Sequence, residues 1–248
     1  MIISHKNRFI FFHNKKTSGT SLEVALSKIC GEEDYVSYSS DESEVLRKKL
    51  LIKNNKNNTT HKIDLKKSYA NISSNIKYFL LKILFKRNMK LKRFNRYIVF
   101  KEKYYGHISP TELKNKISLD IWQNYFKFGT YRSFSDQFYS MYNHHMVFKN
   151  RIKYEDYFNN FSEKFFDEIF QFYNDEDVYW LNFASIQNSL SILEKKIKIN
   201  FNIYECYKNI NLRSDYVKFS RELSSNSKNK LNYYENLIKD KINSRLLI

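Results

Sequence analysis

A short polar run between two apolar patterns carries residues whose types could bind an anion. Residues 8–12, RFIFF, predict a buried strand. Apolar residues at helical spacing predict a helix soon after it, namely Leu22, Ala25, Leu26 and Ile29. A helix N-terminus offers unpaired N–H groups and a partial positive charge of about half a unit. A tight loop that leads into it forms a cradle for phosphate, so residues 15–21 are predicted to bind an anion.

The residue types in this loop suit that role. Gly19, one of four glycines in the chain, lets the backbone approach a ligand closely. Lys16 supplies a charge, and hydroxyl donors come from Thr17, Ser18, Thr20 and Ser21. The lysine precedes the glycine, unlike in the ATP-binding pattern G-x-x-x-x-G-K-[ST], so a phosphate-bearing ligand other than ATP is predicted. The alternative is an ordinary helix N-cap, in which the hydroxyls satisfy the first turn.

A second candidate site lies where another strand is predicted to end. Residues 126–131, FKFGTY, predict a strand, and a helix is predicted from about Phe134 to Met146. Arg132 at the carboxyl end of that strand could hold a phosphate through two parallel hydrogen bonds. Ser140 would lie on the helix that follows. The alternative is a surface arginine and an ordinary helical serine.

His107 is the first candidate for a general base, because histidine titrates near neutral pH. Gly106 and Pro110, the only proline, frame it in a turn after a strand predicted at 97–101. Glu112 is expected to orient this histidine or to cap the next helix. The alternative is a structural histidine that caps a helix starting near residue 111.

Three further histidines could take part in chemistry. His13, at the end of the first strand, is the second candidate for the base. His144 and His145 are adjacent, but no cysteine or carboxylate accompanies them at ligand spacing, so no metal is predicted.

The loop resembles the phosphosulfate-binding loop of sulfotransferases, P-K-T-x-G-T-[ST]. Six positions from Lys16 to Ser21 fit it, and Lys15 stands at the proline. The second site is similar to the 3′-phosphate motif R-x-P-x-x-x-x-x-S-x-Y of the same enzymes. Arg132, Ser140 and Tyr142 match its R, S and Y, and Phe134 stands at the proline.

The segment around His107 also resembles this family. GHIS is similar to the G-H-[VI]-S segment of heparan-sulfate-type uronosyl 2-O-sulfotransferases, and to the H-x-S-x-x-E stretch of bacterial carbohydrate sulfotransferases. The resemblance implies that His107 is the catalytic base. Near residues 182–186, where relatives often carry an Arg-Phe-Glu-x-Leu run, this chain reads NFASI and lacks both charges.

The resemblance implies a sulfuryl transfer from PAPS, 3′-phosphoadenosine 5′-phosphosulfate, to a hydroxyl of a glycan or glycolipid. The loop residues Lys16 to Ser21 would bind the phosphosulfate, with Lys16 also acting in catalysis. Arg132 and Ser140 would bind the 3′-phosphate. The implied fold is a P-loop-NTPase-like three-layer α/β/α fold.

The order of elements independently predicts an α/β fold with a mainly parallel sheet, because strands alternate with helices. The chain of 248 residues is interpreted as one domain, residues 1–248. It would contain a basic insertion at about 40–96, which starts with a helix near 42–52. The part from about 150 to 248 is expected to be helical, with helices near 161–173, 184–196 and 215–241.

A net charge of +17 indicates an anionic partner, or a lysine-rich codon bias that leaves the charge on the solvated surface. Residues 76–96 are basic and amphipathic. They predict a helix that lies on a membrane or guides an anionic glycan, or a helix with an ordinary core-facing side.

Cys30 and Cys206 lie far apart in the sequence and favour a reducing cytoplasm. No apolar stretch is long enough for a signal peptide or a membrane span. The expected location is therefore the cytoplasm, with the inner face of the membrane as a second possibility.

Three other functions remain open from the sequence. The first is nucleic-acid binding, favoured by the charge and by 20 Tyr and 21 Phe residues, although no known nucleic-acid motif occurs. The second is a P-loop kinase, and the third a glycan-binding protein without catalysis.

Overall fold

The structure is a computed structural model of the chain, and it describes residues 1–37, 41–50, 52, 105–148, 152–199, 201–209 and 220–247. The larger part of the predicted insertion at 40–96 lies outside the described residues. So do the amphipathic segment 76–96 and the strand predicted at 97–101.

The described strands form one sheet of six, in the order β3-β1-β2-β4-β5-β6. Strands β2, β4, β5 and β6 pair in parallel, and β1 runs antiparallel to both its neighbours. The predicted α/β class with a mainly parallel sheet is therefore confirmed. The bounds are β1 (Ile2–Ser4), β2 (Phe9–Phe12), β3 (Tyr35–Val36), β4 (Phe126–Tyr131), β5 (Val178–Asn182) and β6 (Leu246–Leu247).

Helices connect and cover these strands. The bounds are α1 (Gly19–Ser27), α2 (Asp41–Lys49), α5 (Pro110–Lys114), α6 (Leu119–Asn124), α7 (Phe134–Phe148), α8 (Tyr154–Phe172), α9 (Ile186–Lys196), α10 (Ile203–Asn209) and α11 (Ser225–Ile242). Short 3-10 helices follow β5 and α11, at η3 (Phe183–Ser185) and η4 (Asn243–Arg245). Among the described helices, none is long and apolar enough to cross a membrane.

Two of the predicted helix starts were wrong. Helix α8 begins at Tyr154, well before residue 161, because its buried aromatic face continues back to that residue. Helix α11 begins at Ser225, since the Ser224 hydroxyl accepts a hydrogen bond from the Ser227 N–H and so caps the helix there. Of the residues expected to precede it, 215–219 lie outside the described part and 220–224 are not helical.

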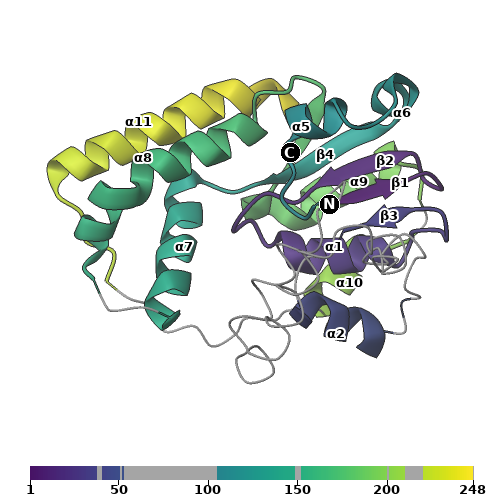
Figure 1. Cartoon of the computed structure of the whole chain (residues 1–248), viewed down its shortest axis with the longest axis horizontal. Coiled ribbons are helices and arrows are strands. Elements are labelled where there is room, and N and C mark those ends of the chain that lie inside the picture. The colour runs from purple at the N-terminus through teal and green to yellow at the C-terminus, as the bar shows by residue number, and fades with distance from the viewer. Residues whose placement is uncertain are drawn as a thin grey trace, which may run out of the picture.

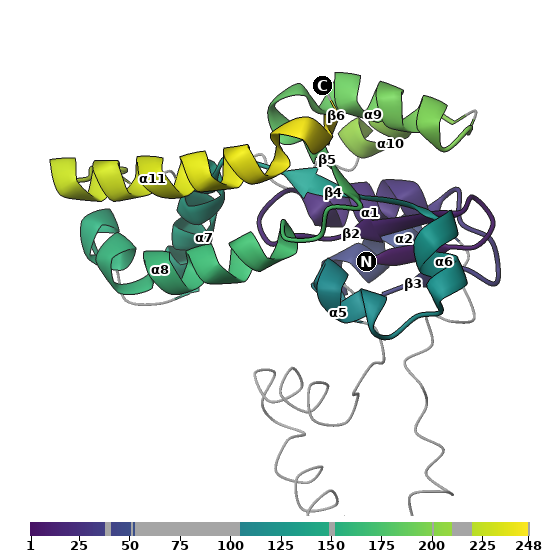
Figure 2. The same ribbon diagram turned by 90° about the horizontal axis from the view of Figure 1, so that it is seen from above.

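Helices pack on both faces of the sheet because the side chains of each strand alternate between them. Along β2, Ile10 and Phe12 face a cluster that includes residues of α5, α6, α7, α8 and α11. Phe9 and Phe11 face a second cluster, formed with α1, α9 and α10. Figure 2 shows α9 and α10 on one side of the sheet and α5 and α6 on the other. The sheet is thus the middle of three layers.

Helices α7, α8 and α11 form a group beside the sheet, past the end of β4 (Figures 1 and 2). Aromatic side chains hold this group together. The Phe138 ring packs 5.5 Å from that of Phe158, and the Phe166 ring stacks on Tyr234 at 4.2 Å. Helix α7, which carries the predicted Ser140, is therefore fixed at its outer side by two long helices.

Gly129 brings β4 and β5 close together. A Cβ at this residue would lie 2.5 Å from a ring atom of Trp180, its partner in register on β5. Glycine therefore lets the fully buried tryptophan pack closely against β4. Because β2, β4 and β5 are parallel neighbours, their carboxyl ends meet at one edge, the usual position of ligand sites in such sheets.

Candidate functional site

The loop between β2 and α1 has an unusual backbone. Four residues other than glycine have positive φ in the described part of the chain, and Lys16 and Ser18 are two of them, each at 58°. Left-handed residues that alternate with others turn successive N–H groups toward one point and form an anion-binding concavity. Such conformations are costly for residues with a Cβ and tend to occur at functional sites.

The start of α1 suits an anion as well. Ser18 is the N-cap residue, but its side chain makes no capping hydrogen bond, and the first turn of α1 contains no acidic residue. The positive end of the helix dipole is thus not neutralised by a carboxylate of the first turn. Side chains at this junction are partly exposed at Lys16, Ser18, Thr20 and Ser21. The ordinary serine or threonine N-cap, which was the alternative, is not formed.

Thr17 supports the loop from below. Its hydroxyl is buried and donates to the carbonyl of Asn14 at 3.0 Å. Because the single proton of the Thr17 hydroxyl is used in that hydrogen bond, its oxygen accepts a second hydrogen bond, from the Thr130 hydroxyl on β4, 2.5 Å away. Of the hydroxyls expected to serve the ligand, that of Thr17 instead ties the loop to the sheet.

Lys15, at the position of the usual proline, is held by three contacts. Its N–H donates to the Asn14 side chain at 2.7 Å, and its carbonyl accepts from Gln137 of α7. Its ammonium group pairs with Glu168 of α8 at 2.5 Å. Asn14 is in turn fixed by the buried hydroxyl of Tyr173, at 3.0 Å. Hydrogen bonds and an ion pair therefore restrain the backbone where a proline ring would do so.

Gly19 lies directly against the ring of His13. A Cβ at residue 19 would be 2.1 Å from His13 Cδ2 and 2.5 Å from its Nε2. This close approach explains why glycine is needed here, independently of any ligand. The buried imidazole of His13 is thus the inner wall of the loop.

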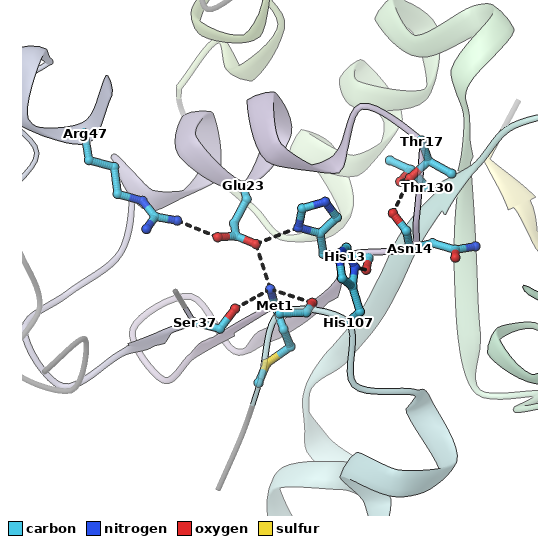
Figure 3. A network of polar contacts seen from close by, with 10 residues as sticks. Met1, His13, Asn14, Thr17, Glu23, Ser37, Arg47, His107 and Thr130 are labelled. Atoms are coloured by element: carbon cyan, nitrogen blue, oxygen red, sulfur yellow. Dashed lines mark hydrogen bonds and ion pairs between the residues drawn. The ribbon is translucent and has the colours of Figure 1, made fainter. Parts of the chain in front are cut away.

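Figure 3 shows a buried network of polar groups behind this wall. The Glu23 carboxylate accepts from His13 Nδ1 at 3.0 Å and from the Met1 amino group at 2.7 Å, and its other oxygen pairs with Arg47 at 2.5 Å. Burial alone would raise the pKa of Glu23, but these cationic and hydrogen-bonding neighbours hold it well below its usual range. Burial lowers the pKa of His13, despite the carboxylate beside it.

His107 joins the loop through this same histidine. Its Nδ1 donates to the carbonyl of His13 at 2.8 Å, and the two rings meet edge to face with centroids 4.7 Å apart. Since a carbonyl only accepts, Nδ1 carries the proton, and Nε2 of the neutral ring is the basic nitrogen. Burial of the ring, then the neighbouring His13, lowers the pKa of His107 to about 3, although the residue as a whole is exposed.

Glu112 does not have the role expected of it. Its carboxylate accepts from the Tyr105 hydroxyl and pairs with Lys116 at 2.6 Å, while the His13 carbonyl orients His107. The helix is capped by Ser109, whose hydroxyl accepts from the Glu112 N–H, so His107 is not its cap either.

Arg132 reaches the loop from the next strand. Its Nη1 donates to the carbonyl of Lys16 at 3.4 Å, and its guanidinium lies over the ring of Phe183, 5.0 Å from the centroid. Ser140 is partly buried on α7, and Tyr142 is buried, with its hydroxyl donating to the carbonyl of Ile152 at 2.8 Å. The structure thus brings the loop, His13, His107 and Arg132 together, and places Ser140 further along α7.

Three residues at this site were not predicted from the sequence: Asn14, Glu23 and Phe183. For Glu23 a signal existed, because a carboxylate inside the apolar run LEVAL is buried only when paired. Each of the three has at least one partner in a distant segment, so the loop sequence alone does not reveal its role. Among the described residues, no group of three or more His, Cys, Asp or Glu side chains could hold a metal ion.

Comparison with known proteins found no match to this chain among family models, curated proteins or solved structures.

Proposed function

We propose that the chain is a sulfotransferase that moves a sulfuryl group from PAPS to a hydroxyl of a carbohydrate. The observation that carries the proposal is the meeting of three segments, each with a sulfotransferase-like motif, at one sheet edge. Arg132 bonds to the Lys16 carbonyl at 3.4 Å, and His107 bonds to the His13 carbonyl at 2.8 Å. These segments are far apart in the sequence, so their meeting is not a consequence of chain proximity.

The chemistry of this edge fits a donor with two separate anionic groups. The uncapped start of α1 and the left-handed residues Lys16 and Ser18 suit a phosphosulfate, which would accept from the N–H groups at 19–21. Arg132 offers the planar, bidentate donor pattern that suits the 3′-phosphate, with Ser140 as its second ligand.

The residues of the loop would stabilise the charge that develops during transfer. The donor, when bound, would supply an activated sulfuryl group whose bond to the bridging phosphate oxygen breaks as the acceptor oxygen bonds to sulfur. Lys16 and the N–H groups at 19–21 would stabilise the negative charge on that bridging oxygen. Loss of one such preorganised donor typically costs about 10²–10³ in rate. Arg132 and Ser140 would fix the orientation of the donor.

His107 would take the proton of the acceptor hydroxyl at Nε2, because its Nδ1 proton is already donated to the His13 carbonyl. Its lowered pKa keeps the ring neutral at pH 7 and thus able to accept a proton. A base of such low pKa holds a proton weakly, but a bound polyanion beside the ring would raise the pKa again. The base would then approach the strength that catalysis near neutral pH requires.

Thermal unfolding with and without 3′,5′-ADP, the product of the donor, tests the donor site. Ligand at about 100 times Kd adds roughly 2.7 kcal/mol, which raises Tm by about 5–10 °C for a domain of this size. We expect this shift in the wild type and not in Arg132→Ala, and no comparable shift with ATP. Arg8→Ala is the matched control, because Arg8 is an exposed arginine just before β2, away from the loop.

Transfer itself is tested with sulfur-labelled PAPS and a panel of desulfated glycans. We expect His107→Asn to reduce transfer by about 10²–10⁴ while the 3′,5′-ADP shift is retained. A folded wild type that shows no shift with millimolar 3′,5′-ADP would overturn the proposal and leave binding of nucleic acid to be tested first. Binding of 3′,5′-ADP without transfer to any glycan would instead favour a non-catalytic relative.

A further inference from the structure

Phe183 is an aromatic residue that lies outside the hydrophobic core of the described part of the chain. It follows β5 directly, is partly exposed, and belongs to neither of the two hydrophobic clusters in the described part of the chain. Its ring instead lies under the guanidinium of Arg132, with the guanidinium carbon 5.0 Å from the ring centroid. At this distance a guanidinium over an aromatic ring is attracted to the face of that ring.

The pairing of β4 and β5 places these two residues side by side. Tyr131 and Asn182 are partners in the parallel register, and Arg132 and Phe183 are the residues that follow them. Both side chains therefore emerge at the carboxyl edge of the sheet, beside the loop that leads into α1.

Phe183 is itself held in place by a chain of hydrogen bonds. The Asn182 side chain accepts from the Ala184 N–H at 3.0 Å and so caps η3. The Asn182 N–H donates to the Ser189 hydroxyl at 3.1 Å, and that hydroxyl donates to the Leu247 carbonyl at 2.5 Å. The ring is thus part of a rigid turn between β5 and α9.

The geometry points to Phe183 as a positioning residue that holds the Arg132 guanidinium across the loop, ready for the 3′-phosphate of the donor. The guanidinium carbon lies over the ring, and the N–H groups of an arginine lie in the plane of its guanidinium. One of these N–H groups, on Nη1, bonds to the Lys16 carbonyl, so the ring and the loop both contact the guanidinium. The inference rests on the proposed function, since it takes Arg132 as the ligand of the 3′-phosphate.

The test compares the binding of two ligands that differ only in the 3′-phosphate. If Phe183 acts through Arg132, its substitution should weaken only the ligand that carries this phosphate. Dissociation constants for 3′,5′-ADP and for 5′-AMP, which lacks that phosphate, are measured by titration calorimetry. We expect Phe183→Leu to reduce the preference for 3′,5′-ADP by about 3- to 30-fold, the range of a partly desolvated cation–π contact. Phe183→Tyr should restore it. Phe161→Leu, at an exposed phenylalanine of α8, is the control and should change neither constant.

A double-mutant cycle separates positioning from general damage. In an Arg132→Ala background, Phe183→Leu should have no further effect on the preference for 3′,5′-ADP. An unchanged preference in Phe183→Leu, or equal weakening of both ligands, would overturn the inference. A wild type that does not prefer 3′,5′-ADP over 5′-AMP would overturn the proposed function itself, and the inference with it.

Discussion

His13 makes three contacts that together connect the loop, α1 and His107. Its ring touches Gly19, its Nδ1 donates to the buried Glu23, and its carbonyl fixes the tautomer of His107. The loop, the interior of α1 and the candidate base are therefore connected through one residue. Changes at Gly19 and at the two histidines should consequently affect one another.

Gly19→Ala tests the contact between loop and ring. The new Cβ would lie 2.1 Å from His13 Cδ2, so the ring or the loop must shift. Overpacking of this kind costs about 1–3 kcal/mol, and we expect urea denaturation to show it together with weaker binding of 3′,5′-ADP. In a His13→Ala background the same substitution should cost much less, since the obstructing ring is gone. Additive effects of the two substitutions would contradict this contact.

The neutral histidines should make stability depend on pH. Both His13 and His107 have lowered pKa values in the folded chain, whereas the unfolded chain binds their protons near pH 6.5. Below pH 6.5 the unfolded state therefore holds more protons, and stability falls as the pH falls toward the folded pKa values. Urea midpoints at pH 7.5, 6.5 and 5.5 measure this decrease.

The slope of stability against pH should be shallower in His107→Asn than in the wild type. His5→Asn is the control, because His5 lies beside Tyr125, outside this network. An identical slope in the wild type and His107→Asn would show that His107 is already protonated at pH 5.5 in the folded protein.

At the scale of elements, α2 is fixed to α1 by a buried ion pair. Arg47 and Glu23 are almost fully buried and 2.5 Å apart. Removing one partner of such a pair typically costs about 3–5 kcal/mol, because it leaves a buried charge less well compensated. We expect the free energy of unfolding of Arg47→Met to fall by close to the lower of these values, since the Met1 amino group and His13 still contact Glu23.

The exposed pair Lys15–Glu168 is the matched comparison. Its side chains are 33% and 41% exposed, so Glu168→Gln should cost less than about 1 kcal/mol. Urea denaturation measures both variants. Equal losses in Arg47→Met and Glu168→Gln would mean that the interior pair does not anchor α2.

Elements with a strong local pattern were predicted well from the sequence. Strand β4 was predicted with its observed bounds, and α1 and α7 were predicted close to theirs, because their apolar residues repeat with the correct period. Strands β1, β3, β5 and β6 were missed, and β5 and β6 lie in the part from about 150 to 248 that was expected to be helical. Strands β1, β3 and β6 have only two or three residues, which acquire strand structure only by pairing with neighbours. The same holds at the site, where the loop was predicted and Phe183 was not, because its role depends on strand pairing.

At the scale of the whole molecule, a chain with a net charge of +17 can bind anions in two ways, which differ in how strongly salt weakens the binding. Dispersed lysines attract any polyanion through the release of counterions, and six to ten such contacts lose about 10³–10⁵ in affinity between 50 and 200 mM salt. A small dianionic or tetra-anionic ligand in the loop instead depends on short hydrogen bonds from fixed N–H groups and from Arg132. These bonds are screened less than contacts between exposed charges.

We therefore expect the affinity for single-stranded RNA to fall steeply with salt, and that for 3′,5′-ADP to fall by much less. Fluorescence anisotropy with labelled RNA and calorimetry with 3′,5′-ADP, each at 50 and 200 mM NaCl, measure the two dependences. Arg132→Ala should abolish the second kind of binding and leave the first almost unchanged, because it removes one positive charge from a large excess. Parallel loss of both ligands with salt, together with displacement of 3′,5′-ADP by RNA at 200 mM, would indicate that the loop belongs to a general polyanion surface and that nucleic acid is the physiological ligand.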